Sequence, residues 1–338
     1  MSRDRDWIQQ TLAHQATDPP PYNFDFTPPA QKMLERHLRA PDLDDALALP
    51  IRTSGPRSVK PLYADPASFG ETLADEFGVT WRTSPIDRGV PIGPPLRAPN
   101  LSHYPFPDPS ASYRFDHLAD WCRANADHYR ILWVGDLWER ASFMRGMSDL
   151  LSDLALNPSF VHRLLDRLAE YVLRTMQVLF ARFPFEGVAL SDDYGTQKAL
   201  IMSPRDWRAF VKPHLAQIYA LAKTNRRTVF HHSCGNVIEI IPDLIDLGLD
   251  ILHPVQPEAM DVFDLKRRFG RHLTLCGGLR TQDLLPRGTP DQVRAEVRRL
   301  KSDLGRDGGY ILEPGITIQA DVPLENILAM IDEARRPL

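Results

Sequence analysis

From about residue 125 onwards, the chain alternates short apolar runs with longer amphipathic stretches. The short runs are rich in β-branched and aromatic residues, as buried strands are, and the longer stretches have the apolar spacing of helices. Pro204, Pro290 and Pro323 stand where helices are predicted to begin, a position that tolerates proline. The predicted strands are 129–134, 187–190, 228–231, 251–253, 273–276 and 310–312, and the predicted helices are 147–183, 204–223, 237–247, 262–269, 290–304 and 323–333.

Six consecutive strand–helix units predict a parallel sheet, because each strand must be returned by a crossover helix. With two further strands between residues 45 and 125, the units would form an α/β (β/α)8 TIM barrel. A doubly wound open sheet is the alternative, but no Gly-x-Gly-x-x-Gly motif opens any predicted helix.

The first part of the chain differs, because 18 of the 30 prolines fall within residues 1–110. Proline fixes φ and removes a backbone donor, so this part should be rich in loops and short elements. Helices are predicted over 3–14 and 30–39, and a strand or hairpin over 75–81, continuing to 89–91. We expect residues 1–70 to be an N-terminal extension that packs on a barrel formed by residues 71–338.

The net charge, the apolar runs and the cysteine count together limit the classes of function that we expect. A formal net charge of −4 gives no electrostatic reason to expect binding to nucleic acid or to an anionic membrane. The first six residues are charged without an apolar signal core, and no apolar run approaches the roughly 20 residues of a membrane span. Three cysteines cannot make a disulfide framework, so we expect a soluble cytoplasmic protein.

Polar residues and potential metal ligands follow the predicted strands, and in such a barrel the active site lies at the carboxyl ends of the strands. Candidates for contact with substrate or cofactor are Asp136, Trp138, Phe143, Tyr194, Gln256 and Gly277, and candidates for metal binding are His232, Cys234 and Cys276. Candidate catalytic residues are Asp192, Asp193 and Glu313.

His232 and Cys234 form a His-x-Cys pair at the end of the strand predicted over 228–231. Residues i and i+2 of a strand point to the same side, so an imidazole and a thiolate could meet one zinc ion. Cys276 is a possible third ligand if its strand is a neighbour. The alternative is a small buried thiol beside a hydrogen-bonded histidine.

The carboxylates leave two alternatives open. Asp192 and Asp193 are adjacent and should point in different directions, one toward substrate or acting as a general base, the other capping a turn. The alternative is that both cap turns or bind surface cations. Glu313 would be costly to bury without a partner. It could be a metal ligand, part of a proton relay, or the partner of an arginine.

Several segments together resemble the uroporphyrinogen decarboxylase superfamily, which includes methylcobamide:coenzyme M methyltransferases and related corrinoid-dependent enzymes. The resemblance covers roughly residues 70–335 and implies a (β/α)8 barrel with an N-terminal extension. The segments that carry it are 75–81, 143–146, 193–195, 202–204, 232–236, 276–278, 313–315 and 322–326.

The two branches of the superfamily imply different sites. The decarboxylases carry an Arg-Gln-Ala-Gly-Arg loop that is absent here, and a tyrosine at the position of Phe143. The methyltransferases bind zinc through His-x-Cys and a later cysteine. His232 and Cys234 match the first two ligands, but Ile316 stands at the third, so Cys276, Glu313 or substrate would complete the shell, or no metal binds.

The resemblance therefore implies an enzyme, with a zinc-dependent methyltransferase as the leading hypothesis. Such an enzyme would move a methyl group between a small thiol, methoxyl or methylamine substrate and a corrinoid. The corrinoid could be bound to a partner protein. One alternative is decarboxylation of a tetrapyrrole or another acidic substrate. A second is a non-catalytic corrinoid or tetrapyrrole carrier, and a homodimer is compatible with each.

Overall fold

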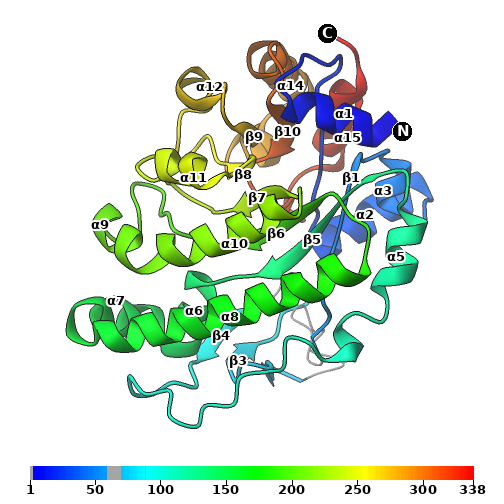
Figure 1. The fold of residues 1–338 in the computed structure, drawn as a ribbon. Helices are drawn as coiled ribbons and strands as arrows, with labels where there is room; N and C mark the ends of the chain where they lie inside the picture. The colour runs from blue at the N-terminus through cyan, green and yellow to red at the C-terminus, as the bar shows by residue number, and fades with distance from the viewer. Residues whose placement is uncertain (1–2, 59–69, 88) are drawn as a thin grey trace.

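The computed structural model describes residues 3–58, 70–87 and 89–338 (Figure 1). Its centre is a sheet of seven parallel strands in the order β1-β5-β6-β7-β8-β9-β10. The sheet curls with helices around its outer side, which is a TIM-barrel-like α/β fold. The strands are β1 Ile51–Ser54, β5 Tyr129–Gly135, β6 Gly187–Ser191, β7 Thr228–His232, β8 Ile251–Val255, β9 Thr274–Leu279 and β10 Tyr310–Pro314.

Helices connect the successive strands. Before β5 lie α1 Arg3–Leu12, α2 Pro28–Leu38, α3 Leu43–Ala46, a 3-10 turn Ser112–Arg114 and α5 Leu118–Ala124. Between β5 and β7 lie α6 Trp138–Arg145, α7 Met147–Leu156, α8 Pro158–Arg182, α9 Pro204–Asp206, a π-helical segment Trp207–Val211 and α10 Lys212–Thr224. The remaining helices are α11 Ile241–Leu247, α12 Val262–Phe269, α13 Leu284–Arg287, α14 Pro290–Gly305 and α15 Leu324–Arg335.

All six strands predicted after residue 125 are confirmed, but two of the predicted helices differ. The helix predicted over 147–183 is two helices, because Asn157 leaves helical geometry (φ −137°, ψ 51°) and Pro158 begins α8. Proline is favoured in the first turn because its missing N–H has no helical partner there. For the same reason the helix predicted over 237–247 begins only at Ile241, with Pro242 in its first turn.

Among the described residues between 45 and 125, one strand joins the large sheet instead of the two expected there. That strand is β1, which pairs in parallel with β5, so the described part of the predicted N-terminal extension contributes a strand to the sheet. β2 Thr72–Ala74, β3 Thr80–Arg82 and β4 Val90–Gly93 form a separate antiparallel sheet, at the position of the predicted hairpin.

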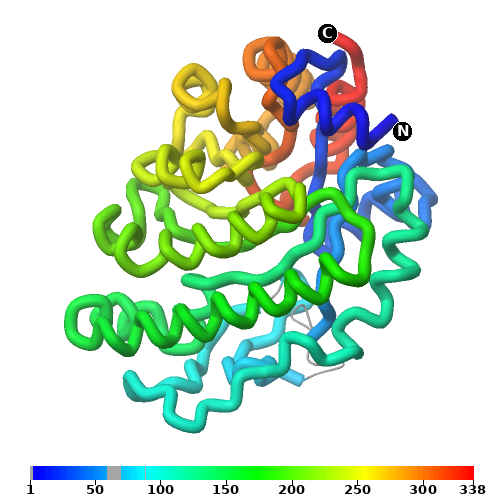
Figure 2. Tube along the Cα trace, viewed as in Figure 1, coloured from blue at the N-terminus to red at the C-terminus, as the bar shows by residue number. Residues whose placement is uncertain are grey.

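Beyond β10, the described chain makes two isolated parallel bridges, between Tyr22 and Leu312 and between Phe26 and Ile318. The residues before Tyr22 are Pro19, Pro20 and Pro21, which have no N–H to donate to a ladder. Figure 2 shows this N-terminal trace running beside the C-terminal one, and the Leu338 amide donates to Asp18 at 2.6 Å.

The inner side of the sheet has its own small core. It contains a side chain from each of the seven strands, and Ile8 of α1 joins them. Side chains alternate between the two faces of a strand, so His231 of β7 faces the helices while His232 faces inward. The inner residues are Ile51, Tyr129, Ile131, Ala189, Phe230, Ile251, Cys276 and Ile311.

Candidate active site

His232, at the end of β7, lies at the centre of the polar groups on the carboxyl edge of the sheet. Its neighbour His231 is completely buried on the helix side, with Nδ1 2.6 Å from the hydroxyl of Tyr219. Burial, and the nearby His232, lower the pKa of His231 to about 3. His231 is therefore a neutral packing residue.

Three side chains form what we call the metal-ligand trio: Asp193, His232 and Cys234. Nε2 of His232 lies 3.5 Å from Cys234 Sγ and 3.5 Å from Asp193 Oδ1. Zinc bonds of about 2.0–2.3 Å place tetrahedral ligand atoms about 3.5 Å apart. Each of the three is partly exposed. The donor set and spacing therefore fit zinc, with room for a fourth ligand.

The loop after Cys234 is held by backbone contacts that require glycine. Gly235 has φ +81°, and a Cβ there would lie 2.4 Å from the carbonyl carbon of Gly195. The Gly235 amide donates to Gln256 Oε1 at 2.6 Å, and the Cys234 amide donates to Asp193 Oδ1 at 2.8 Å. Gln256, predicted to contact substrate, is buried and instead positions this loop.

A second group, the buried trio, consists of His253, Cys276 and Glu313 from β8, β9 and β10. The Cys276 thiol donates to Glu313 Oε2 at 2.8 Å, and His253 Nε2 lies 3.4 Å from the same oxygen. Burial, together with the charge of Glu313, raises the pKa of Cys276 well above its usual range. Burial alone would raise the pKa of Glu313, but His253 and the hydrogen bonds of Cys276 and Asn23 lower it.

The two trios touch through their histidines, whose Nδ1 atoms are 3.0 Å apart. Cys276 was expected to join His232 and Cys234 as a third metal ligand. The structure groups Asp193 with them instead, because Cys276 lies one layer deeper, in the inner core, and donates to Glu313. Ile316, at the third ligand position that the resemblance implied, is 42% exposed.

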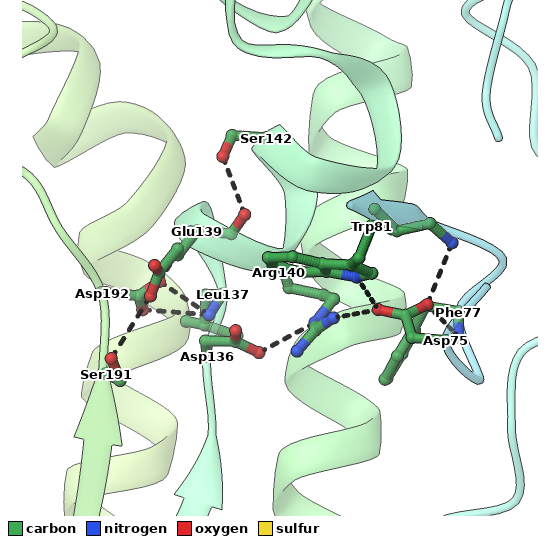
Figure 3. Close-up of polar contacts among 11 residues, drawn as sticks. Asp75, Phe77, Trp81, Asp136, Leu137, Glu139, Arg140, Ser142, Ser191 and Asp192 are labelled. Atoms are coloured by element: carbon green, nitrogen blue, oxygen red, sulfur yellow. Dashed lines mark hydrogen bonds and ion pairs between the residues drawn. The ribbon is translucent and has the colours of Figure 1, made fainter. Parts of the chain in front are cut away.

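Asp192 points away from the trios, and Figure 3 shows its contacts. It is completely buried and accepts hydrogen bonds from the amides of Leu137 (2.9 Å) and Glu139 (2.8 Å) at the start of α6. The hydroxyl of Tyr194, also completely buried, donates to it at 2.9 Å. Asp192, predicted to be catalytic, and Tyr194, predicted to contact substrate, thus hold α6 against β6 through these hydrogen bonds.

Arg140 organises the other polar cluster drawn in Figure 3. It donates to Asp75 Oδ2 at 2.9 Å and to Asp136 Oδ1 at 3.2 Å. Burial disfavours its charge, but Asp136 and Asp75 outweigh this and raise the pKa of Arg140. Asp75 also accepts from Trp81 Nε1 at 3.0 Å. The cluster fixes the separate antiparallel sheet to the start of α6.

A cavity of about 310 Å³ opens beside this cluster, lined among others by Trp133, Asp136, Arg140 and Thr175. Trp133, which lines the cavity, also packs edge-on against His232 of the metal-ligand trio, with ring centroids 6.4 Å apart. The buried hydroxyl of Thr175 has no hydrogen-bond partner within the part of the chain that the structure describes. Asp136 is thus the predicted contact residue that does line a cavity.

Three other residues that were predicted to contact substrate or cofactor pack against other parts of the fold. Trp138 is completely buried in the main core, and Phe143 packs edge-on against Trp81 with centroids 5.0 Å apart. Gly277 has φ +133°, and a Cβ there would lie 2.5 Å from the Val255 amide nitrogen. None of the three is among the residues that line the cavity.

Sequence reasoning missed Asn23 and Asp25. Asn23 Nδ2 donates to Glu313 Oε1 at 3.0 Å. The side chain of Asp25 is exposed at its surface, but partial desolvation and the charge of Glu313 raise its pKa to about 7. The signal was a period-two pattern over 22–26, where two polar residues alternate with aromatic ones.

Comparison with known proteins places this site in a family. The model of the family described as uroporphyrinogen decarboxylase (URO-D) matches residues 72–337. The chain belongs to the URO-D family. The match includes both trios and omits the segment that carries Asn23 and Asp25.

Two kinds of enzyme are found among the curated relatives of this URO-D family chain. It is 25% identical over 213 residues to a uroporphyrinogen decarboxylase of Psychromonas ingrahamii, a match covering 59% of this chain and 56% of that protein. It is 23% identical over 191 residues to a methylated-thiol–coenzyme M methyltransferase of Methanosarcina mazei, covering 56% and 48%. The chain thus spans about half the length of the curated relatives it matches.

A solved structure confirms the fold. A methyltransferase from Methanosarcina mazei superposes with a TM-score of 0.69 over 99% of this chain and 98% of that one, at 18% identity. At that identity the likeness supports the barrel architecture alone. Among the described residues, no helix combines the length and apolar character needed to cross a membrane.

Proposed function

We propose that this URO-D family chain is a zinc-dependent, methyltransferase-like enzyme that acts on a small thiol or methylated substrate. One observation carries the proposal: Nε2 of His232 lies 3.5 Å from both Cys234 Sγ and Asp193 Oδ1. Catalytic zinc sites keep three protein ligands and one open position. The similarity to a methylated-thiol–coenzyme M methyltransferase agrees with this chemistry.

His232, Cys234 and Asp193 would hold the ion, with no requirement for a cysteine at Ile316. Bound zinc would supply one kind of chemistry, which is to keep a substrate thiol deprotonated near neutral pH. The thiolate sulfur would form the new bond to the methyl carbon of a methylated corrinoid, and the corrinoid would keep the electron pair of the broken cobalt–carbon bond. The reverse direction would methylate the corrinoid.

The rest of the site would position the reactants. The cavity of about 310 Å³ has room for a small substrate, and Trp133, one of its lining residues, also contacts His232 of the trio. Asp136 and Arg140 would orient polar groups of that substrate, and Thr175 offers a hydroxyl that has no partner among the described residues. A corrinoid, free or carried by a partner protein, would approach from the partly exposed side of the trio.

A second candidate function is decarboxylation of a tetrapyrrole or another acidic substrate. The observation that favours it is the family match together with relatives named as uroporphyrinogen decarboxylases. It needs no metal, so Asp193 and the arginines would bind substrate directly. Arg140 is a weak carboxylate ligand for this purpose, because Asp75 and Asp136 already neutralise it.

The test is methyl transfer from methylcobalamin to coenzyme M or 2-mercaptoethanol, followed through the corrinoid absorption spectrum. We expect zinc-loaded wild type to transfer the methyl group, and chelated protein or Cys234→Ser to lose at least 100-fold in rate. Re-addition of zinc should restore the wild type but not the variant. Equal activity in chelated and loaded protein would refute the metal-dependent proposal, and porphyrinogen decarboxylation by chelated protein would establish the second candidate.

A further inference from the structure

We propose that Glu313 and His253 form a hydrogen-bond relay that keeps the proton of His232 on Nδ1, which leaves Nε2 able to bind the metal. The inference rests on the proposed function, since it concerns the same site. The observation behind it is a continuous line of polar atoms from β10 to β7. Glu313 Oε2 is 3.4 Å from His253 Nε2, and His253 Nδ1 is 3.0 Å from His232 Nδ1.

The contact between the two histidines can hold only one proton. A neutral imidazole has one N–H donor and one bare acceptor nitrogen. If His232 donates from Nδ1, His253 accepts there and must carry its own proton on Nε2. If His253 donates instead, His232 must carry its proton on Nε2, the nitrogen that faces Cys234 and Asp193.

Glu313 selects between these two arrangements. Its carboxylate only accepts hydrogen bonds, and it receives them from the Cys276 thiol at 2.8 Å and Asn23 Nδ2 at 3.0 Å. A bare His253 Nε2 at 3.4 Å would place two acceptors against each other. The favourable arrangement therefore has His253 Nε2–H donating to Glu313 and His232 Nδ1–H donating to His253.

The same logic assigns the buried trio a supporting role instead of a second metal site. A metal on His253 Nε2 would require its proton on Nδ1, and this proton would then face His232. His232 would carry its own proton on Nε2 and could not bind metal. With neutral histidines, the two trios cannot both hold an ion, so zinc should bind at one equivalent per chain.

Histidine ligands of zinc usually donate their second N–H to a protein acceptor, and loss of that acceptor typically weakens metal binding about 10- to 100-fold. In this chain the acceptor is another histidine, itself fixed by a carboxylate. Glu313 and His253 are thus positioning residues, which act through His232 and do not touch substrate.

The first test needs no activity and no metal. ¹⁵N chemical shifts of the imidazole nitrogens distinguish N–H from bare nitrogen, and the His232 signals can be assigned by comparison with His232→Gln. In metal-free wild type we expect the proton of His232 on Nδ1, and in Glu313→Leu a mixture of both tautomers. A proton on Nε2 of His232 in the wild type, or on both nitrogens of His253, would overturn the relay.

The second test is zinc affinity, measured by competition with a chromophoric chelator. We expect His253→Phe, which cannot accept, to bind zinc about 10- to 100-fold more weakly. His253→Gln keeps an acceptor and should recover most of that loss. Equal zinc affinity in His253→Phe and wild type would contradict the relay. Wild type that binds no zinc would end the proposed function, while the tautomer measurement would still decide the relay.

Discussion

The two trios have nearly the same donors, one His, one Cys and one carboxylate each, but they differ in access and protonation. In the metal-ligand trio the side chains of His232 and Asp193 are 23% and 36% exposed, whereas those of His253 and Glu313 are 9% and 3% exposed. A thiol that donates to a carboxylate is protonated, and a protonated thiol does not bind zinc. Residue types alone therefore do not identify the metal site. Access and hydrogen bonding decide which trio can bind.

The largest expected difference between the trios is in the response to loss of each cysteine. Cys234→Ser should abolish stoichiometric zinc binding, because it removes one of three protein ligands. Cys276→Ser should retain one zinc per chain, because serine keeps a donor to Glu313. Zinc content after gel filtration, with both variants checked for cooperative unfolding, measures this directly. Zinc lost in both variants would restore Cys276 as a ligand.

Substitutions of the two adjacent aspartates should affect different properties, one the stability of the fold and the other the binding of zinc. Asp192→Ala leaves two amides at the start of α6 and the hydroxyl of Tyr194 buried without an acceptor. Each unsatisfied group costs about 1–3 kcal/mol, so we expect a loss of about 3 kcal/mol or more in the free energy of unfolding. Asp193→Ala should cost much less stability but weaken zinc binding, as chemical denaturation and chelator competition can measure.

The opposite result would be weaker zinc affinity in Asp192→Ala and unchanged zinc affinity in Asp193→Ala. It would exchange the roles that we assign to the two residues. Asp192→Asn is the matched control, since its amide oxygen can still accept from the start of α6. It should recover part of the stability that Asp192→Ala loses.

The sequence predicted the barrel well because its strands are buried on both faces and read as continuous apolar runs. The positions of His232 and Cys234 followed from the same pattern, since residues after a parallel strand lie at its carboxyl edge. Which carboxylate joins them could not be predicted. Asp192 and Asp193 are adjacent and identical, and only the three-dimensional path of the β6–α9 loop shows which one caps α6 and which one faces the trio.

Long-range contacts account for the other misses. Asn23 reaches Glu313 across 290 positions of sequence, and no local pattern encodes such a pairing. The structure groups Cys276 with His253 and Glu313, and a related reason explains why the sequence did not predict these neighbours. The strand of Cys276 is two places from β7 in the sheet, because β8 lies between them, and chain order alone does not give the depth of a side chain inside a barrel.

A smaller effect should follow from substitution of Gln256, the residue that holds the loop after Cys234. Gln256→Leu removes the acceptor for the Gly235 amide, a contact of 2.6 Å. A buried amide left without an acceptor costs about 1–3 kcal/mol, so we expect that loss in unfolding free energy and weaker zinc binding. Gln256→Glu keeps an acceptor oxygen and should recover both. Unchanged zinc affinity in Gln256→Leu would show that the loop does not depend on this contact.

The smallest effect concerns Asp25, beside the buried trio. Its pKa in the folded protein is about 7, well above that of an aspartate in the unfolded chain, about 3.9. Between pH 4 and 7 the unfolded chain releases this proton while the folded protein keeps it, so Asp25 lowers stability progressively as pH rises through that window. Asp25→Asn should therefore be more stable than wild type at pH 7 and nearly equal to it at pH 4.

Urea midpoints of both proteins at pH 4, 5.5 and 7 measure that growing difference, and solvent access to Asp25 will keep it modest. Glu313 is the control that ties the effect to the buried trio, because its negative charge is one cause of the raised pKa of Asp25. In a Glu313→Gln background the pH dependence of the Asp25→Asn effect should shrink. If it stays the same, desolvation alone sets the pKa of Asp25, and the N-terminal segment is electrostatically independent of the relay that supports His232.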